Sequence, residues 1–436
     1  MTARSCRAQG QSGLDRWGNG ERDDIDGRDE TSDVIESSGA VLGRDLGGNR
    51  RAPRPHADKV DAGVGGERRG VDAARPRSAA DEPDSHLLRH HLLLSPNRLD
   101  DGSQPAVCES RPVRYIIFGA GGIGGTIGAC LHQAGHDVLL VARGAHYEAI
   151  KADGLRFETP EQSVVLDVPV VDRPEAVGWR NDDAAVLAMK SQDTASALAA
   201  LAAVAPSSLP VACAQNGVEN ERATLRHFEH VYGICVMCPT SFLQPGVVQA
   251  YSAPLTGLLD LGRYPSGVDT VAEEMASALA SSTFASEARR DIMRWKYGKL
   301  LLNLTNALIA LAGPEAARAD LAKQVRAEAV ACLQAAGIEF VDRDEDRARR
   351  GDLLTMRPIG GAHRRAGSTW QSLERGLGTV ETDYLNGEIV LLGRLHGVPT
   401  PVNELLQRLT ADAARGGTAP GTVPVDHLEA ALAVGS

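Results

Sequence analysis

The sequence predicts an α/β domain with a mainly parallel sheet, followed by an all-helical domain and preceded by a long disordered extension. Three observations lead to this prediction. Strand and helix patterns alternate from residue 113 to about 287, helical periodicity alone continues from 288 to 436, and residues 1–112 hold too few apolar side chains to form a core. We therefore expect three parts, at 1–112, 113–287 and 288–436.

The composition argues against several classes of function. A net charge of −11, with no basic face carrying interleaved aromatic residues, argues against nucleic-acid binding. No apolar run approaches about 18 residues, so we expect no membrane span, and the first residues lack the apolar core of a signal peptide. The seven cysteines are scattered, and Cys235 and Cys238 have no second pair or histidine set to complete a metal site. We expect a cytoplasmic protein with reduced thiols and no metal.

The first 112 residues differ from the rest of the chain. They are rich in Arg, Asp, Gly and Pro and contain a single aromatic residue, Trp17. Because this composition cannot offset the entropy of ordering the chain, it predicts disorder. No methionine occurs between Met1 and Met189, and Val113 opens the first strand pattern. We hypothesise that the natural product begins at Val113 through a GTG start codon; a genuine disordered tail is the alternative.

A glycine-rich turn follows the first predicted strand. The β-favouring run that starts at Val113 leads into Gly119-Ala120-Gly121-Gly122-Ile123-Gly124, and a helical pattern follows. In a dinucleotide fingerprint the first glycine makes the tight turn, the second lets the backbone approach a pyrophosphate, and the third lets helix and strand pack closely. The helix N-terminus then favours the anion. The turn therefore predicts a dinucleotide site, with a turn that binds no ligand as the alternative.

The second predicted strand, residues 137–142, ends at Arg143. This position lies about 20 residues past the glycines, where an NAD site usually places an acidic residue on the ribose 2′-hydroxyl. An arginine there is suited to a 2′-phosphate instead. We therefore expect NADPH rather than NADH, unless Arg143 is only a solvated strand-end residue.

Further strand patterns end in polar residues. Residues 184–189 lead to Lys190, and 210–214 lead to Asn216, so both side chains are expected at the carboxyl edge of the sheet, where ligands bind in open α/β folds. The remaining expected elements are a β-run at 168–171, a hairpin formed by 231–237 and 246–251, and helices at 268–281, 291–309, 316–336, 379–396 and 403–414.

A polar stripe occupies the first helix of the second domain. Lys299, Asn303 and Asn306 stand at i, i+4 and i+7, on one face of an otherwise apolar helix. Buried polar groups need hydrogen-bond partners, so this stripe either contacts another helix or faces a site. Glu381, near the start of a later predicted helix, either belongs to the same site or only favours the helix dipole.

Taken in series, these motifs resemble the ketopantoate reductase (2-dehydropantoate 2-reductase) family from about Val113 to Gln407. The motifs that carry the resemblance are GAGGIGG at 119–125, Lys190, Gln215-Asn216-Gly217, Pro245-Gly246-Val247, Asp291-Ile292 with Trp295, Lys299-Leu-Leu-Leu-Asn303, and Glu381-Thr-Asp-Tyr384-Leu-Asn386-Gly387. The resemblance implies a Rossmann domain followed by a helical domain like that of 6-phosphogluconate dehydrogenase. It also implies reduction of 2-dehydropantoate to (R)-pantoate, a step of pantothenate and coenzyme A biosynthesis.

The resemblance also implies roles for single residues. NADPH would lie along Gly119–Gly124 with Arg143 on its 2′-phosphate, and Lys190 and Asn216 would line the nicotinamide end. Lys299 would be the general acid and Glu381 its acidic partner. Asn216, Asn303 and Ser368 would hold substrate oxygens.

The sequence departs from the family pattern at two places. The usual second asparagine, eight residues after the lysine, is Ala307, and we expect the adjacent Asn306 to be a candidate for its role although it is rotated about 100° around the helix. The segment from Gly367 to Glu381 is also one residue longer than in common members. Both departures concern substrate contacts, so the reaction type is better supported than the substrate.

Three functions therefore stay open. The first is the reduction of ketopantoate, and the second is reduction of another 2-keto or 3-hydroxy acid on the same fold. The third is a non-catalytic NADP(H)-binding sensor, for which Lys299 would not matter. In the first two, a lysine ammonium aimed at the carbonyl oxygen would stabilise the alkoxide and protonate it; Lys296 is the competing lysine, on a different face from Asn303. Oligomeric state is not determined by the sequence, and a homodimer remains open.

Overall fold

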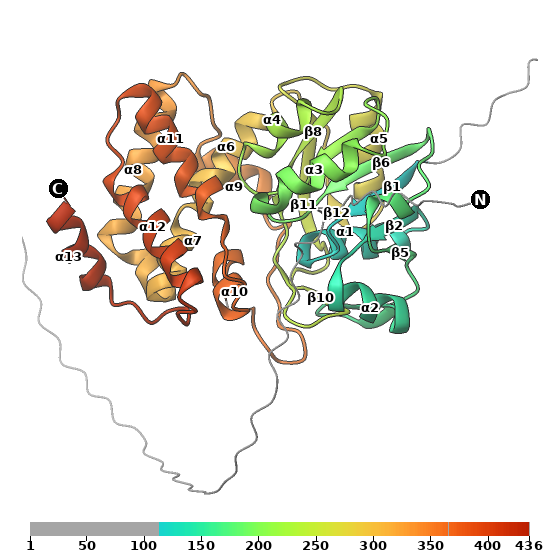
Figure 1. Cartoon of the computed structure of the whole chain (residues 1–436), viewed down its shortest axis with the longest axis horizontal. Helices are drawn as coiled ribbons and strands as arrows, with labels where there is room; N and C mark the ends of the chain where they lie inside the picture. Colours follow the sequence, from blue (N-terminus) through green and yellow to red (C-terminus); the bar gives the residue numbers. More distant parts are fainter. Residues whose placement is uncertain (1–112, 365, 436) are drawn as a thin grey trace, which may run out of the picture. The chain divides into compact units, whose positions relative to one another are not determined.

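The structure, a computed structural model, describes residues 113–364 and 366–435 (Figure 1). The expectation of a disordered tail and the hypothesis about its origin concern residues 1–112, which lie outside the described residues. Within the described part, an α/β sheet region is followed by a helical region, which confirms the predicted fold class.

The first region is built on an eight-stranded sheet in which the first strand is central. The strand order is β12-β11-β8-β7-β6-β1-β2-β5. The bounds are β1 Arg114–Phe118, β2 Asp137–Val141, β5 Val170–Val171, β6 Asp183–Leu187, β7 Pro210–Cys213, β8 His230–Met237, β11 Gly257–Arg263 and β12 Phe284–Ala285. Neighbours pair in parallel except β8 with β11. Because the chain leaves β1 first toward β2 and later returns to β6 on the other side, β1 and β6 form a topological switch point, where ligands bind in such sheets.

Helices accompany the sheet strands. They are α1 Gly122–Gln133, α2 Gly144–Asp153, α3 Thr194–Ala202, α4 Asn220–Leu225 and α5 Thr270–Ala280, with short 3-10 turns η1 Pro174–Ala176 and η2 Ser191–Asp193. One apolar core includes Ile117 of β1, Ile127 and Leu131 of α1, and Leu279 of α5, all fully or nearly fully buried. Burial of this apolar face holds α1 on the sheet and so fixes the glycine turn between β1 and α1.

A second, four-stranded sheet corrects one expectation. It has the order β4-β3-β10-β9, with β3 Leu155–Glu158, β4 Ser163–Leu166, β9 Thr240–Ser241 and β10 Val247–Ala250. The predicted hairpin between 231–237 and 246–251 is wrong, because β8 pairs with β7 and β11 while β10 pairs with β3 and β9. The physical reason is burial: β8 is buried at every residue but its first and needs a neighbour on each side, whereas β10 alternates between buried and half-buried residues.

The second region is helical. Its helices are α6 Ile292–Asn303, α7 Thr305–Ala312, α8 Asp320–Ala335, α9 Arg343–Arg350, α10 Ser368–Glu374, α11 Asn386–His396, α12 Pro401–Arg415 and α13 Val425–Gly435, with 3-10 turns η3 Pro314–Arg318 and η4 Glu381–Tyr384. The expected long helix at 291–309 is interrupted at Leu304, which keeps helical dihedral angles. The expected helix at 379–396 begins only at Asn386, so Glu381 lies in a separate 3-10 turn. No helix in the described part of the chain is both long and apolar enough to cross a membrane.

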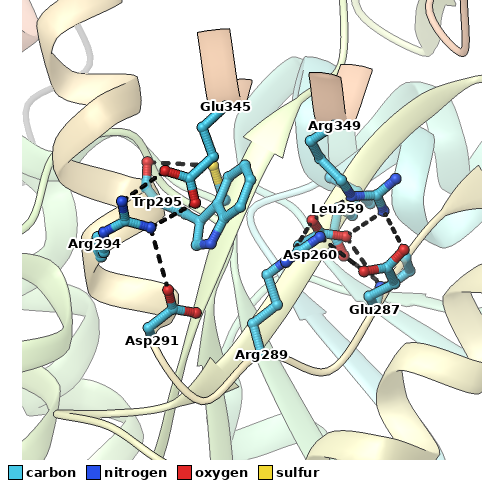
Figure 2. A network of polar contacts seen from close by, with 11 residues as sticks. Leu259, Asp260, Glu287, Arg289, Asp291, Arg294, Trp295, Glu345 and Arg349 are labelled. Atoms are coloured by element: carbon cyan, nitrogen blue, oxygen red, sulfur yellow. Dashed lines mark hydrogen bonds and ion pairs between the residues drawn. The ribbon is translucent and has the colours of Figure 1, made fainter. Parts of the chain in front are cut away.

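A network of charges, buried at Asp260 and half-exposed elsewhere, ties α9 to the large sheet and to α6 (Figure 2). Asp260 of β11 is fully buried and accepts hydrogen bonds from Arg289 at 2.6 Å and from Arg349 of α9 at 2.7 and 2.8 Å. Arg294 of α6 makes a two-pronged pair with Glu345 of α9, both bonds being 2.6 Å long. These contacts hold α9 against β11 and α6, and they fix the point at which the segment after α9 begins.

Candidate functional site

The glycine turn after β1 has the geometry of an anion cradle. Gly119 has φ +101°, and a Cβ built on it would lie 2.8 Å from Met189 N. A Cβ on Gly124 would lie 2.0 Å from Gly119 O and 2.8 Å from Ala188 Cβ, so only glycine fits at both positions. A Cβ on Gly121 would meet nothing nearer than Phe242 at 3.7 Å. The backbone at Gly121 can thus be approached by a ligand, and the first N–H groups of α1 have no intrahelical acceptor.

His146, a residue that the sequence did not single out, holds this turn in place. Its Nε2 lies 2.7 Å from Ala120 O, and its Nδ1 accepts a hydrogen bond from Gly246 N at 2.9 Å. Because Nδ1 accepts, Nε2 carries the proton and donates it to Ala120, so the ring is neutral. Burial lowers the pKa of His146, which favours this neutral form. The turn is therefore preformed, clamped between α2 and the loop before β10.

Arg143 lies at the N-terminal cap of α2, immediately after β2. Its side chain is 59% exposed, and one of its guanidinium nitrogens lies 4.0 Å from the carboxylate of Asp193 in η2. Both residues follow strands next to β1, so Arg143 is placed at the carboxyl edge of the sheet, as expected from the sequence. At this edge of the sheet, a residue that follows a strand can contact a bound dinucleotide.

Lys190 connects the end of β6 with two segments of the helical region. Its ammonium donates to Ser372 Oγ at 2.5 Å and to Ser368 O at 3.4 Å, both in α10. It also lies 3.7 Å from Glu381 Oε2. The other carboxylate oxygen of buried Glu381 accepts hydrogen bonds from Ser191 N at 3.1 Å and Ser191 Oγ at 3.3 Å. Lys190, Ser368 and Glu381, which the sequence nominated, thus lie together, and Ser191 and Ser372 join them.

Asn216 belongs to the neighbouring loop of the same sheet edge. Its carbonyl oxygen accepts hydrogen bonds from Ser191 Oγ at 3.4 Å and from Asn220 Nδ2 at 3.1 Å. The next residue, Gly217, has φ +82°, and a Cβ on it would lie 2.8 Å from Tyr384 O of η4. The loops after β6 and β7 and the turn that carries Glu381 are therefore held as one unit.

The two lysines of α6 have different surroundings. Lys296 is buried, forms an ion pair with buried Glu221, and donates to Gln215 O at 2.9 Å and Ile234 O at 3.4 Å. An ammonium has three N–H groups, so Lys296 has none left for a substrate. Its role is to join α6 to α4 and to the sheet. The partner, Glu221, carries no sequence signal that predicts this pair.

Lys299, one turn later, is half-buried and makes no hydrogen bond or ion pair with any residue that the structure describes. Burial lowers its pKa, and the positive charges of Arg350 and Arg364 act in the same direction, opposed by Asp346 and by Cys235. Burial also raises the pKa of the Cys235 thiol to about 11, so this group is uncharged at neutral pH. Lys299 therefore presents free N–H groups with a proton that is easier to release than that of an ordinary lysine.

The two asparagines of the polar stripe follow Lys299. Asn303 is buried, and its Nδ2 has no hydrogen-bond partner among the described residues, so it is a donor in need of an acceptor. A Cβ built on Gly367 would lie 3.1 Å from Asn306 Oδ1, which places Asn306 against the start of α10, where Ser368 lies. Ala307 is buried in the apolar core of the helical region and contributes no polar group.

The structure therefore brings Lys190, Asn216, Ser368 and Glu381 together, and it pairs Glu381 with Lys190. No hydrogen bond or ion pair joins Glu381 to Lys299 within residues 113–364 and 366–435. Sequence reasoning did not identify His146, Glu221, Ser372 or Arg364. One missed element did have a signal: Asp342 caps α9 by accepting from Asp344 N and Glu345 N, and its spacing to Glu345 is typical of a helix start.

Comparisons with known proteins match both regions of the chain. The model of the family described as ketopantoate reductase PanE/ApbA matches residues 115–265, and the model of its C-terminal part matches residues 291–414. The 2-dehydropantoate 2-reductase of Mesorhizobium japonicum is 32% identical over 342 residues, which covers 69% of this chain and 98% of that protein. The enzyme of the same name from Pyrococcus abyssi is 27% identical over 303 residues, covering 67% and 95%.

Solved structures show the same fold. A PanE/ApbA family ketopantoate reductase from Ralstonia eutropha matches with a TM-score of 0.59 and 30% identity, over 70% of this chain and 99% of that one. A D-mandelate dehydrogenase with NADH and anilino(oxo)acetate matches with a TM-score of 0.60 and 24% identity, over 70% of this chain and 100% of that one. At that identity the second match concerns the fold alone.

Proposed function

The chain belongs to the ketopantoate reductase PanE/ApbA family, and from this premise we propose that it reduces 2-dehydropantoate to (R)-pantoate with NADPH. The observation that carries the proposal is the half-buried, unpaired ammonium of Lys299, one helical turn before the unsatisfied amide of Asn303. A proton donor and a hydrogen-bond donor on one helix face suit a substrate that gains negative charge on oxygen.

The residues of the sheet edge fit a dinucleotide. The support is the cradle itself, in which Gly119 and Gly124 admit no side chain while the backbone at Gly121 stays approachable. We assign the pyrophosphate to the turn Gly119-Ala120-Gly121-Gly122-Ile123-Gly124, the 2′-phosphate to Arg143, and the nicotinamide end to Lys190 and Asn216. When bound, NADPH supplies the hydride that is added to the carbonyl carbon.

Lys299 holds the proton that the reaction consumes. As the carbonyl carbon is reduced, negative charge develops on the oxygen, and the ammonium stabilises it before donating the proton. The lowered pKa of Lys299 makes this donation easier, while Lys296 cannot compete because its protons are engaged by Glu221, Gln215 and Ile234.

The remaining residues bind and orient the substrate. Asn303 supplies its unused amide donor to a substrate oxygen, and Asn306 and Ser368 flank the same region at the start of α10. Glu381 acts through Lys190 and Ser191, since its carboxylate binds both. It is therefore a positioning residue that fixes Lys190 and the loop after β6.

Reduction of another 2-keto or 3-hydroxy acid is the second candidate. The observation that favours it is Ala307, which is buried among apolar residues and leaves one substrate contact of the family pattern without a polar side chain. A non-catalytic NADP(H) sensor is disfavoured by the free and activated Lys299, because binding alone does not require it.

A substrate screen tests the proposal. Purified protein is mixed with NADPH and either 2-dehydropantoate or another 2-keto acid, and in a second assay with NADP and 3-hydroxy acids. The absorbance at 340 nm is followed in both. We expect the largest kcat/KM for 2-dehydropantoate. A larger value for another acid would favour the second candidate, and NADPH binding without turnover of any acid would favour the sensor.

A further inference from the structure

Arg364 is a charged residue that neither the fold nor the proposed reaction has used. It lies in the segment between α9 and α10 and is half-buried. Its Nε donates to Thr240 O of β9 at 3.1 Å. Within the described part of the chain, its guanidinium has no carboxylate partner, and its two terminal nitrogens make no hydrogen bond. A guanidinium carries five N–H donors, so most of its binding capacity is unused.

The two arginines at the end of α9 differ from Arg364 because each has a carboxylate partner. Arg350, at the end of α9, is paired with the carboxylate of Asp346. Arg349 is likewise held by Asp260. Arg364 has no such counter-charge, yet it lies close enough to Lys299 for its positive charge to act on that ammonium. Two half-buried cations that have no carboxylate partner in the described part of the chain, and whose charges act on each other, favour the binding of an anion.

The position of Arg364 also links the two halves of the site. Thr240, whose carbonyl it binds, packs against the start of α1, since a Cβ on Gly122 would lie 2.9 Å from Thr240 Oγ1. The same carbonyl accepts a hydrogen bond from Gln371 Nε2 of α10 at 3.2 Å. Three residues after Arg364, Gly367 touches Asn306. Arg364 is therefore bound to a residue that packs against the start of α1, and it lies on the segment that leads to Asn306.

We propose that Arg364 binds the carboxylate of the 2-keto acid and thereby makes the site selective for acids over neutral ketones. In such a substrate the carboxylate is bonded directly to the carbonyl carbon. The unused terminal nitrogens of Arg364, at the start of α1 and on the segment that reaches Asn306, therefore suit the carboxylate when the carbonyl oxygen is on Lys299. Arg–carboxylate pairs are strong and directional. This inference rests on the proposed reductase function and assigns the group that determines its substrate class.

Two variants and a matched control test the assignment. Arg364→Gln removes the charge, Arg364→Lys keeps it, and Arg357→Gln is the control because Arg357 lies on the same segment but pairs with Glu161 on the surface. The substrates are 2-dehydropantoate and its cyclic ester, which lacks the carboxylate. We expect Arg364→Gln to raise KM for the acid by about 10- to 100-fold, with the ester hardly affected, partial rescue by Arg364→Lys and no change in the control.

A pH profile separates a binding role from a structural one. Because Arg364 lowers the pKa of Lys299, its neutralisation raises that pKa and shifts the alkaline fall of kcat/KM to higher pH. The other charged or titratable groups near Lys299 are Arg350, Asp346 and Cys235, which stay unchanged in this variant. An NADPH affinity equal to that of the unaltered protein shows that the variant is folded; if Arg364→Gln fails this check, Arg364→Lys gives the answer through its acid-to-ester selectivity.

Failure of this inference can be told from failure of the proposed function. If the unaltered protein reduces the acid but Arg364→Gln keeps the same preference for acid over ester, the inference alone is wrong. If no turnover occurs, calorimetric binding of 2-dehydropantoate in the presence of NADP decides: binding that Arg364→Gln abolishes supports the carboxylate site without the reaction. Equal binding to both proteins, or no binding to either, overturns the inference.

Discussion

At the scale of single residues, the chemistry depends on which of two lysines in one helix is free. Lys299→Ala should lower kcat by about 10²- to 10⁴-fold, the usual contribution of a positioned proton donor. NADPH affinity should stay nearly constant, because the phosphates are assigned to the glycine turn and Arg143. Single-turnover hydride transfer with 2-dehydropantoate, followed by stopped-flow absorbance, measures the effect.

The control for this change is Lys323→Ala, a surface lysine of α8 that pairs with Asp320. Near-normal hydride transfer by Lys299→Ala would remove Lys299 from the mechanism and point to Lys190.

The pH profile gives the same test without a mutation. The donor must be protonated, so kcat/KM for reduction should fall as pH rises through the Lys299 pKa, and burial places that fall below 10.5, the ordinary lysine value.

Arg143 determines the choice of cofactor in the proposed site. Arg143→Asp should weaken NADPH binding by roughly 10- to 100-fold, through loss of a charge-assisted contact and added repulsion. NADH, which lacks the 2′-phosphate, should be affected far less. Fluorescence titrations of both cofactors measure this, with Arg173→Asp as the surface control beside Asp172. Equal losses for NADPH and NADH would show that Arg143 does not bind the phosphate.

At the scale of elements, features that depend on residues close in sequence could be predicted, and features that depend on residues distant in sequence could not. The order strand, glycine turn and helix around Gly119 was predicted because each part is determined by local residues and periodicity. The hairpin with β8 was predicted wrongly because pairing depends on partners distant in sequence, and burial of β8 selected β7 and β11. The long helix at 291–309 was placed correctly, apart from its interruption at Leu304.

The candidate site shows the same division. Lys299, Asn303 and Glu381 follow from spacing and from the family resemblance. Arg364, Ser372 and His146 do not, because each acts through a contact between residues that are 100 or more positions apart in the sequence. The contacts of Glu381 with Lys190 and Ser191 likewise cannot be predicted without the fold, since Ser191 and Glu381 are 190 residues apart in the sequence.

The charged network around Asp260 stabilises the packing of α9 on the large sheet. Asp260→Ala should lower the free energy of unfolding by about 3–5 kcal/mol, because it leaves Arg289 and Arg349 without their buried counter-charge. Urea unfolding measures the loss, and Asp172→Ala, in an exposed pair with Arg173, should change it hardly at all. Equal effects of the two variants would contradict a stabilising role for the network.

At the scale of the whole molecule, the described fold contains four apolar clusters of buried residues. Two of them cover the opposite faces of the large sheet, and a third lies among the helices from α6 to α13. The smallest packs Ile292 and Trp295 of α6 against β8 and β11. Buried Lys296 and Asp260 link the two regions through Glu221 and Arg349. The helix that carries Lys299 is therefore held against the sheet that carries the glycine turn, and a site built from both depends on these links.

The last prediction concerns residues 1–112. A protein of residues 113–436 should be soluble, unfold in urea at the same midpoint as the full chain and bind NADPH with the same affinity. The reasons are that 1–112 lack the apolar composition for a core, and that 69% of this chain already covers 98% of the Mesorhizobium japonicum relative. Parallel urea curves and NADPH titrations of the two proteins are the measurement. An insoluble shortened protein, or one that binds NADPH more weakly, would show that the extension contributes to the fold or the site.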